Sequence, residues 1–454
     1  MRDGAGRPGR LAAACLAVAA VSLLLPWALA FDPWAWLVWG REVTRLELDT
    51  EGGPSWKPLP VVATTVLTLA GGAAPALWLV LARAGGLLAI AGAAALAGRI
   101  AGPVAAATAA AAMAVSDWWL FNSALGNSEG LLAAAVLWAA VAHLGKRHRL
   151  ALVLLLGAAL LRPEAWPFLG LYALWLWRTG RERLPLLAAA LLPVPLLWFG
   201  PDVIGSGGAL GASEAARGTA SPQSAVNADF PALEVLLDFG ALLTVPALVA
   251  AGAGAALGGP VARGLAAGAV AWVALVAVMT QAGYAGNPRY NVAAAAVGCV
   301  LAGVGVAALA GREPRSRSPL AWLLAAALVA GVLAFTADDL SDQVGELGDR
   351  ADRRTDLTAL IDEAGGAEEV NDCAPARTVQ PMKAMLAWRL DVSMEHLADP
   401  PRTPVAVFQA PPGYAGERPE PPVRELIGPP VATQGDWTLF EVCELRPSAA
   451  RTAP

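Results

Sequence analysis

The sequence predicts an all-α polytopic membrane protein with about eleven transmembrane helices, followed by a small C-terminal extracytoplasmic α/β domain. Of its 454 residues, 56% are hydrophobic and only 15% are charged, and the mean hydropathy is +0.53. Soluble domains carry about 25% charged residues, so an ordinary soluble enzyme is excluded. The charge also changes along the chain: residues 1–336 carry a net charge of +5 and residues 337–454 a net charge of −10. We therefore expect a membrane domain over 1–336 and a water-exposed domain over 337–454.

A transmembrane helix needs about 20 mainly apolar residues, and runs of about that length recur through the first region. The candidate spans are roughly 11–30, 77–98, 102–117, 128–145, 149–161, 165–178, 184–200, 237–257, 264–283, 291–310 and 318–336. The basic start of the chain and Ala28-Leu29-Ala30 imitate a cleaved signal peptide. We expect the first helix to be retained, because the loop after it needs an anchor at the membrane surface.

The loops between the candidate spans alternate in charge, which predicts their sides of the membrane. With the N-terminus in the cytoplasm, the cytoplasmic loops receive the basic clusters Arg2, Arg7, Arg10, Arg99, Lys146, Arg147, Arg149, Arg178, Arg181, Arg183, Arg263, Arg312, Arg315 and Arg317. The outer face receives the segments 31–76, 117–127, 201–236 and 286–291 and the acidic tail. This alternation predicts a multi-pass plasma-membrane protein. The chain carries no basic block large enough to bind nucleic acid.

The first outer loop, 31–76, is aromatic and apolar with charges at its edges. Residues 31–43 contain three tryptophans, which favours an amphipathic helix lying in the membrane interface. A second apolar piece, Leu59–Ala70, is too short to be a confident span and is expected to be another interfacial helix.

The tail alternates short helical and strand-like segments, which predicts a small α/β module. We expect an acidic helix over about 340–364, a strand at Val370–Cys373, a helix near Pro381–Leu390, strands at Pro404–Gln409 and Trp437–Leu445, and a proline-rich loop at 411–430. Cys373 and Cys443 both lie in this tail, so an oxidising compartment would allow them to form one disulfide.

The motifs of common metal and nucleotide sites do not occur in the sequence. There is no CxxC, no HExxH and no GxxxxGK[ST] pattern, and the histidines number three. A structural zinc site and an ATP-binding loop are therefore excluded. No metal site is predicted, and the participation of a divalent cation is left open.

Charged residues at membrane depth are costly and tend to face a cavity or a partner. Such residues gather on the predicted outer face: Asp32, Lys57, Asp117, Glu129, Arg162, Glu164 and Arg289. A carboxylate can take a proton from a hydroxyl, and lysine or arginine can hold a phosphate leaving group. Each residue also has a structural reading, as a helix cap, an interfacial lysine or an ion pair at a bend.

The order of these residues resembles the GT-C class of polyprenyl-phosphate-dependent glycosyltransferases, in its protein-O-mannosyltransferase and aminoarabinose-transferase branch with actinobacterial relatives. The resemblance rests on Phe31-Asp32-Pro33-Trp34, on Trp56-Lys57-Pro58-Leu59, and on the run Arg83, Gly98-Arg99-Ile100-Ala101-Gly102, Ser116 and Glu129. It covers roughly residues 11–180, and beyond them it rests on topology and on Arg289-Tyr290. The family's Pro-Pro pair directly after the lysine and the acidic pair directly beside Asp32 are missing, and Glu129 replaces the family's aspartate.

The resemblance implies roles for the individual residues. Asp32 would be the general base, with Glu129 as a second acidic group in the catalytic site. Lys57 would contact the lipid phosphate, with Arg289 and Arg162 as further phosphate-binding residues.

The implied activity is inverting transfer of a sugar, such as mannose or arabinofuranose, from a polyprenyl-phosphate donor on the outer face of the membrane. The acceptor would be a cell-envelope glycan, lipid or protein, and membrane lipid surrounds the enzyme. A secondary transporter is one alternative, but it would show an inverted repeat and polar groups near the midplane. A non-catalytic membrane scaffold for envelope assembly is the other, and it predicts that Asp32 and Lys57 can be replaced without consequence.

Overall fold

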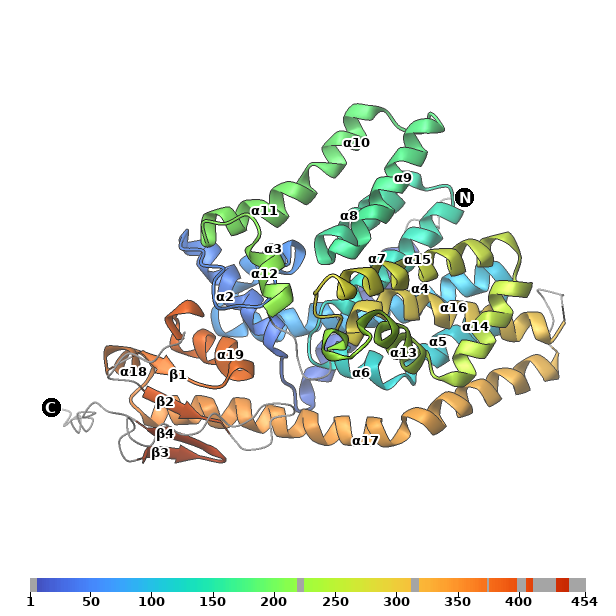
Figure 1. Ribbon diagram of the computed structural model, residues 1–454. Coiled ribbons are helices and arrows are strands. Elements are labelled where there is room, and N and C mark those ends of the chain that lie inside the picture. The colour runs from blue at the N-terminus through green and yellow to red at the C-terminus, as the bar shows by residue number, and fades with distance from the viewer. Residues whose placement is uncertain are drawn as a thin grey trace.

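The computed structural model describes residues 6–218, 224–311, 318–373, 375–397, 406–410 and 430–440. Most of the helices form a large body. The long helix α17 (Pro319–Glu363) runs from one edge of this body to a small sheet beyond its other edge (Figure 1). The helices of the body are α1 (Gly6–Val21), α2 (Phe31–Arg45), α3 (Pro58–Leu67), α4 (Ala74–Ala101), α5 (Pro103–Ala114), α6 (Asp117–Ala124), α7 (Glu129–Leu144), α8 (His148–Leu161), α9 (Trp166–Arg178), α10 (Leu184–Leu191), α11 (Pro193–Gly205), α12 (Gly211–Gly218), α13 (Pro231–Leu243), α14 (Val245–Leu257), α15 (Gly259–Gln281) and α16 (Val292–Leu309).

The centre of the body is built from α4, α5, α7, α14 and α16, and α16 is buried from Val292 to Val306. Small residues allow these helices to approach closely. A Cβ atom added to Gly305 would collide with the main chain of Ala250, and one added to Gly303 would collide with that of Ala105. Helix packing of this kind is typical of membrane interiors. This close packing fixes the position of α16 and of the turn just before it, which carries Arg289.

Five helical segments are long and apolar enough to cross a membrane within the described residues, or seven if each of two bent pairs counts as one span. Three further helices of this part are apolar but shorter, including those at 129–144 and 148–161. The polytopic helical membrane domain is therefore confirmed, whereas the count of about eleven spans stays a prediction.

Two of the expected spans are interrupted. The first helix ends at Val21 and a 3-10 turn at Leu24, short of the predicted residue 30, because Pro26 cannot continue a helix. The expected span 237–257 is wrong as a single helix, since α13 and α14 meet at an angle of 96°. The break lies at Thr244, whose φ is 62°. Pro246 follows two residues later and prevents the helical hydrogen bond at that point.

The loop 31–76 contains two helices, α2 and α3, as the sequence predicts. The position of α2 in the membrane interface stays a prediction, but its residues from Asp32 to Glu42 are all buried by the protein itself. One side of α2 packs on α3 and another on α19 of the tail (Gln380–Leu390). Tertiary contacts therefore cover the tryptophans that the sequence alone assigns to the lipid interface.

The helix α17 runs without interruption from Pro319 to Glu363, along one side of the whole molecule (Figure 1). Its first part is apolar and its second part acidic, so the change of composition after Thr336 falls inside one helix. Thr336 itself is buried and donates a hydrogen bond to the carbonyl of Val115. The acidic helix expected over 340–364 is the second half of α17.

The described part of the tail after α17 forms a four-stranded sheet with two helices, which confirms a small C-terminal α/β region. The order of the strands is β1-β2-β4-β3, with β1 and β2 parallel and the other pairs antiparallel. The elements are α18 (Ala367–Cys373), β1 (Ala376–Arg377), α19 (Gln380–Leu390), β2 (Ala406–Gln409), β3 (Pro430–Gln434) and β4 (Trp437–Phe440).

The predicted helix near Pro381–Leu390 is confirmed as α19, and the predicted strands at 404–409 and 437–445 correspond to β2 and β4. The predicted strand at Val370–Cys373 is wrong, since these residues end α18. Glu368 and Glu369 lie in the first turn of that helix, where negative charge stabilises the helix dipole. The strand β3 was not expected. The side chain of Cys373, the residues 411–429 and Cys443 lie outside the part that is described, so the disulfide stays a prediction.

Candidate active site

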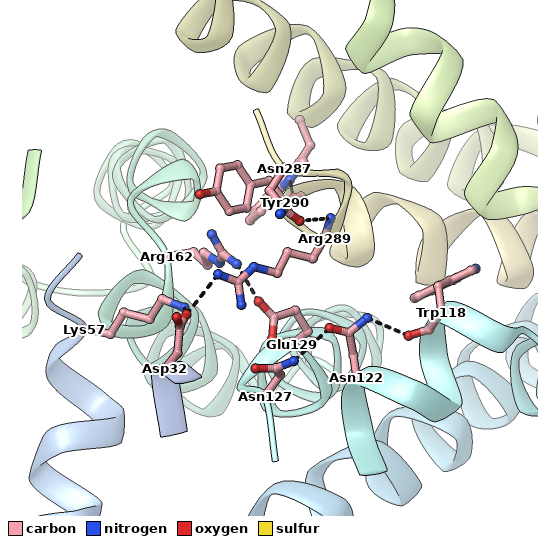
Figure 2. Close-up of polar contacts among 11 residues, drawn as sticks. Asp32, Lys57, Trp118, Asn122, Asn127, Glu129, Arg162, Asn287, Arg289 and Tyr290 are labelled. Atoms are coloured by element: carbon pink, nitrogen blue, oxygen red, sulfur yellow. Dashed lines mark hydrogen bonds and ion pairs between the residues drawn. The ribbon is translucent and has the colours of Figure 1, made fainter. Parts of the chain in front are cut away.

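Asp32 lies in the first turn of α2 and is buried. One of its carboxylate oxygens, Oδ2, accepts two charged donors: Lys57 Nζ at 3.1 Å and Arg289 Nη2 at 3.0 Å. Figure 2 shows these three side chains converging from different parts of the chain. The residue expected to be the base is therefore bound to the two residues expected to hold phosphate.

Lys57 is placed by the two prolines that follow it. It is the N-cap of α3, with an extended backbone at φ −136° and ψ 112°, as is usual for a residue before proline. Its ammonium group lies 4.9 Å from the centre of the Trp36 ring, a cation–π distance. The side chain is therefore held at the start of the helix and aimed at Asp32.

Arg289 reaches the site from the short 3-10 helix Pro288–Asn291 that precedes α16. The side chain of Asn287 caps this turn by accepting the backbone N–H of Arg289 at 3.1 Å, and Trp272 Nε1 donates to the carbonyl of Tyr290 at 2.9 Å. The Arg289 side chain remains 25% exposed, against 7% for that of Lys57, which makes Arg289 the more accessible of the two cations.

Glu129 and Arg162 form a second ion pair beside the first. Glu129 opens α7, and Arg162 lies in extended conformation between α8 and Pro163; both are buried. Arg162 Nη2 bonds Glu129 Oε1, and the guanidinium lies 4.2 Å from the centre of the Tyr290 ring. The break between the two predicted spans 149–161 and 165–178 thus places an arginine in the site.

The charges in the cluster change the protonation of its members. Burial alone would raise the pKa of Asp32, but the positive charges of Arg289 and Lys57 outweigh it and hold this pKa well below its usual range. Burial, together with the charge of Arg162, lowers the pKa of Lys57 to about 8 against the opposing effect of Asp32. At neutral pH the pair is charged, and Asp32 is a weak base while both cations bind it.

All five residues that the sequence singles out for catalysis and phosphate binding meet in this cluster: Asp32, Lys57, Glu129, Arg162 and Arg289. Glu164 is buried next to them and interacts electrostatically with Arg162. Asp117 does not join the cluster, because its carboxylate accepts a hydrogen bond from Gln343 of α17 at 3.3 Å.

Sequence reasoning missed a row of neutral polar groups beside Glu129. Asn127 Nδ2 donates to Asn122 Oδ1 at 3.0 Å, and Asn122 Nδ2 donates to the carbonyl of Trp118 at 2.7 Å (Figure 2). The one available signal was the position of Asn127, two residues before a candidate acid. Trp36 was read as an interfacial aromatic, and not as a partner of Lys57.

A metal site is not formed by the described residues, where no three His, Cys, Asp or Glu side chains are grouped closely enough to hold an ion. Participation of a divalent cation stays a prediction.

Comparison with solved structures confirms the expected GT-C-like fold. The solved structures that the chain resembles include ArnT from Cupriavidus metallidurans bound to undecaprenyl phosphate, with a TM-score of 0.61, 15% identity, and coverage of 98% of this chain and 100% of that one. The apo state of the same protein gives a TM-score of 0.59 at 15% identity, covering 96% of this chain and 97% of that one. No protein-family model and no curated protein sequence matches the chain.

Proposed function

We propose that this protein is an inverting glycosyltransferase that moves a sugar from a polyprenyl-phosphate donor to a cell-envelope acceptor on the outer face of the membrane. The observation that carries the proposal is the shared binding of Lys57 and Arg289 to one oxygen of Asp32. Two cations on one largely buried carboxylate match the needs of the reaction, which releases a phosphate anion and removes a proton. The fold shared with ArnT, which is solved with undecaprenyl phosphate bound, supports this choice.

The described arrangement suggests how donor binding prepares the site. The donor phosphate is an anion that competes with Asp32 for Lys57 and for the more accessible Arg289. When the cations turn to phosphate, Asp32 loses the charges that keep its pKa low and becomes a stronger base. Donor binding and activation of the base are thereby coupled.

The transfer replaces the bond from the anomeric carbon to the phosphate oxygen with a bond to the acceptor oxygen. Asp32 takes the proton of an acceptor hydroxyl while the acceptor oxygen bonds to the anomeric carbon of the sugar. The bond between that carbon and the phosphate oxygen breaks, and its electron pair leaves on polyprenyl phosphate. Lys57 and Arg289 stabilise the charge on the leaving group. Attack on the face opposite the phosphate inverts the anomeric centre.

This function requires the charged cluster to lie on the outer face of the membrane. The segments predicted to lie on that face contact one another in the structure, which supports this topology. The first loop, the 117–127 segment, the 286–291 turn and the tail were assigned to the outer face by loop charge alone. Ala30 N donates to Leu125 O at 3.0 Å, Arg289 reaches Asp32, and α19 packs on α2. We infer that the N-terminus is cytoplasmic and that the tail is extracytoplasmic.

The test is a transfer assay with purified protein in detergent. Radiolabelled undecaprenyl phosphates carrying mannose or arabinofuranose are incubated with a mixed envelope glycan, lipid and protein acceptor fraction. The proposal predicts label in the acceptor fraction and loss of label transfer in Asp32→Asn. Binding of undecaprenyl phosphate without any transfer would favour the scaffold, and uptake of a solute into liposomes would favour the transporter.

A further inference from the structure

Asn127 lies in the turn that precedes α7, and it is held there by several contacts. Its backbone N–H donates to the carbonyl of Asn122 at 3.1 Å, and Trp78 Nε1 donates to the carbonyl of Gly126 at 2.9 Å. The residue is only 5% exposed. Its side chain lies at the charged cluster, next to Glu129 (Figure 2).

The hydrogen bonds of the neighbouring asparagine decide which way the amide of Asn127 points. Asn122 uses its NH₂ group to donate to the carbonyl of Trp118, which can only accept. The other end of the Asn122 amide, Oδ1, must therefore be an acceptor. It faces the NH₂ group of Asn127. The carbonyl Oδ1 of Asn127 is consequently the end left over.

That carbonyl oxygen is buried and has no hydrogen-bond partner among the residues that the structure describes. The same holds for Glu129 Oε2, the oxygen of that carboxylate not used by Arg162. Buried acceptors without a donor are costly, so two of them on residues only two positions apart indicate that a ligand supplies the donors.

The charge of this pair indicates a neutral donor group. Glu129 is already ion-paired with Arg162, and the amide of Asn127 carries no charge. Hydroxyl groups, which donate one hydrogen each, satisfy these acceptors without bringing a further charge into the buried site, where an unpaired charge is expensive.

We propose that Asn127 Oδ1 and Glu129 Oε2 each accept a hydrogen bond from a hydroxyl group of the sugar being transferred. This rests on the proposed function and adds the substrate feature that the site reads: a neutral hydroxyl, and not an ammonium group. Asn127 is then a specificity-determining residue, and Asn122 positions it.

The test compares ligands with and without the sugar. Affinities of undecaprenyl phosphate, undecaprenyl phosphate carrying mannose or arabinofuranose, and undecaprenyl phosphate carrying 4-amino-4-deoxyarabinose are measured on the full chain in detergent. Asn127→Ala should weaken binding of the neutral-sugar lipid roughly five- to thirtyfold and leave undecaprenyl phosphate unchanged. Asn371→Ala, in the tail, is the matched control and should change neither.

Removal of single hydroxyls from the donor sugar supplies the second arm. One deoxy donor should bind the wild-type protein as weakly as the complete donor binds Asn127→Ala, and combining the two changes should cause no further loss. If alanine impairs folding, Asn127→Ser replaces it in the same cycle. Equal weakening of the sugar-free lipid, additive losses for every hydroxyl, or preferred binding of the amino sugar would each overturn the inference. Failure of the wild type to bind undecaprenyl phosphate at all would instead refute the proposed function.

Discussion

The side chain of Arg41 on α2 contacts the C-terminal end of α19, almost 350 positions later in the chain. Its guanidinium donates to the carbonyls of Val392 at 2.7 Å and Trp388 at 3.2 Å, and it pairs with Asp391 at 2.9 Å. The unpaired carbonyls at a helix end attract positive charge. The tail is therefore bound to the same helix, α2, that carries Asp32.

Replacing Arg41 should release this contact. We expect Arg41→Ala to destabilise the docked tail by roughly 2–4 kcal/mol, because the carbonyls at the end of α19 lose their charged donor. Hydrogen exchange in α19 should become faster. Arg45→Ala is the matched control: Arg45 also pairs with Asp391 at 2.9 Å but is 46% exposed, so its loss should cost at most about 1 kcal/mol. Equal effects of the two variants would contradict the assignment.

Glu42 on α2 predicts a pH-dependent stability. Burial raises the pKa of Glu42 from 4.5 to about 7, although the N–H of Asp49 partly opposes this. The folded protein therefore retains a proton that the unfolded chain loses. Stability is complete below about pH 4.5 and falls by up to roughly 3 kcal/mol as the pH rises through 7.

Glu42→Gln should remove that dependence. The variant should melt at a higher temperature than wild type at pH 8, and its melting temperature should change less between about pH 5 and pH 8. Glu47→Gln, which alters an exposed residue nearby, should leave the profile unchanged. An identical pH profile for wild type and Glu42→Gln would show that Glu42 is not the titrating group.

Lys57 sets an upper pH limit for donor binding. Its pKa is lowered to about 8 by burial and by Arg162, and only the ammonium form binds phosphate strongly. Affinity for undecaprenyl phosphate should be flat below pH 8 and should weaken above it by up to roughly tenfold per pH unit. Lys57→Arg stays charged and should remove this slope even if its affinity is lower. The same slope in both proteins would assign the limit to another group.

The membrane orientation can be tested by labelling in intact cells. In a background with the four native cysteines replaced by alanine, a cysteine at Arg147 should resist a membrane-impermeant thiol reagent, and one at Glu395 should react. Both positions are exposed on the protein, so a difference in labelling reports the side of the membrane. Labelling at 147 from outside would reverse the proposed topology.

The charged cluster could be predicted from the sequence because charges at membrane depth are rare and need a purpose. Asp32, Lys57 and Arg289 each stand beside a proline or in a short turn at the end of an apolar run, and these local signals are strong. Their mutual distances could not be predicted, since Arg289 lies more than 200 residues from the other two.

The features that could not be predicted from the sequence share a physical cause: each depends on contacts between residues far apart in the chain or on main-chain groups. The burial of α2 depends on α19. The orientation of the Asn127 side-chain amide depends, through Asn122, on the main-chain carbonyl of Trp118. Neither relationship leaves a periodic pattern in the sequence. The sequence did not predict that α17 is continuous, because its composition changes from apolar to acidic along its length. Both kinds of residue can form helix, so this change does not end it.

The central claim is that Asp32 is the base and that it competes with the donor phosphate for Lys57 and Arg289. The most direct measurement is turnover and undecaprenyl phosphate affinity of Asp32→Asn, at matched expression and folding. The claim predicts that turnover falls by about 10²–10⁴-fold, while the sugar-free lipid binds at least as tightly as it does to wild type because its competitor is gone. Near-normal turnover would contradict the assignment of the base, and loss of lipid affinity would contradict the competition.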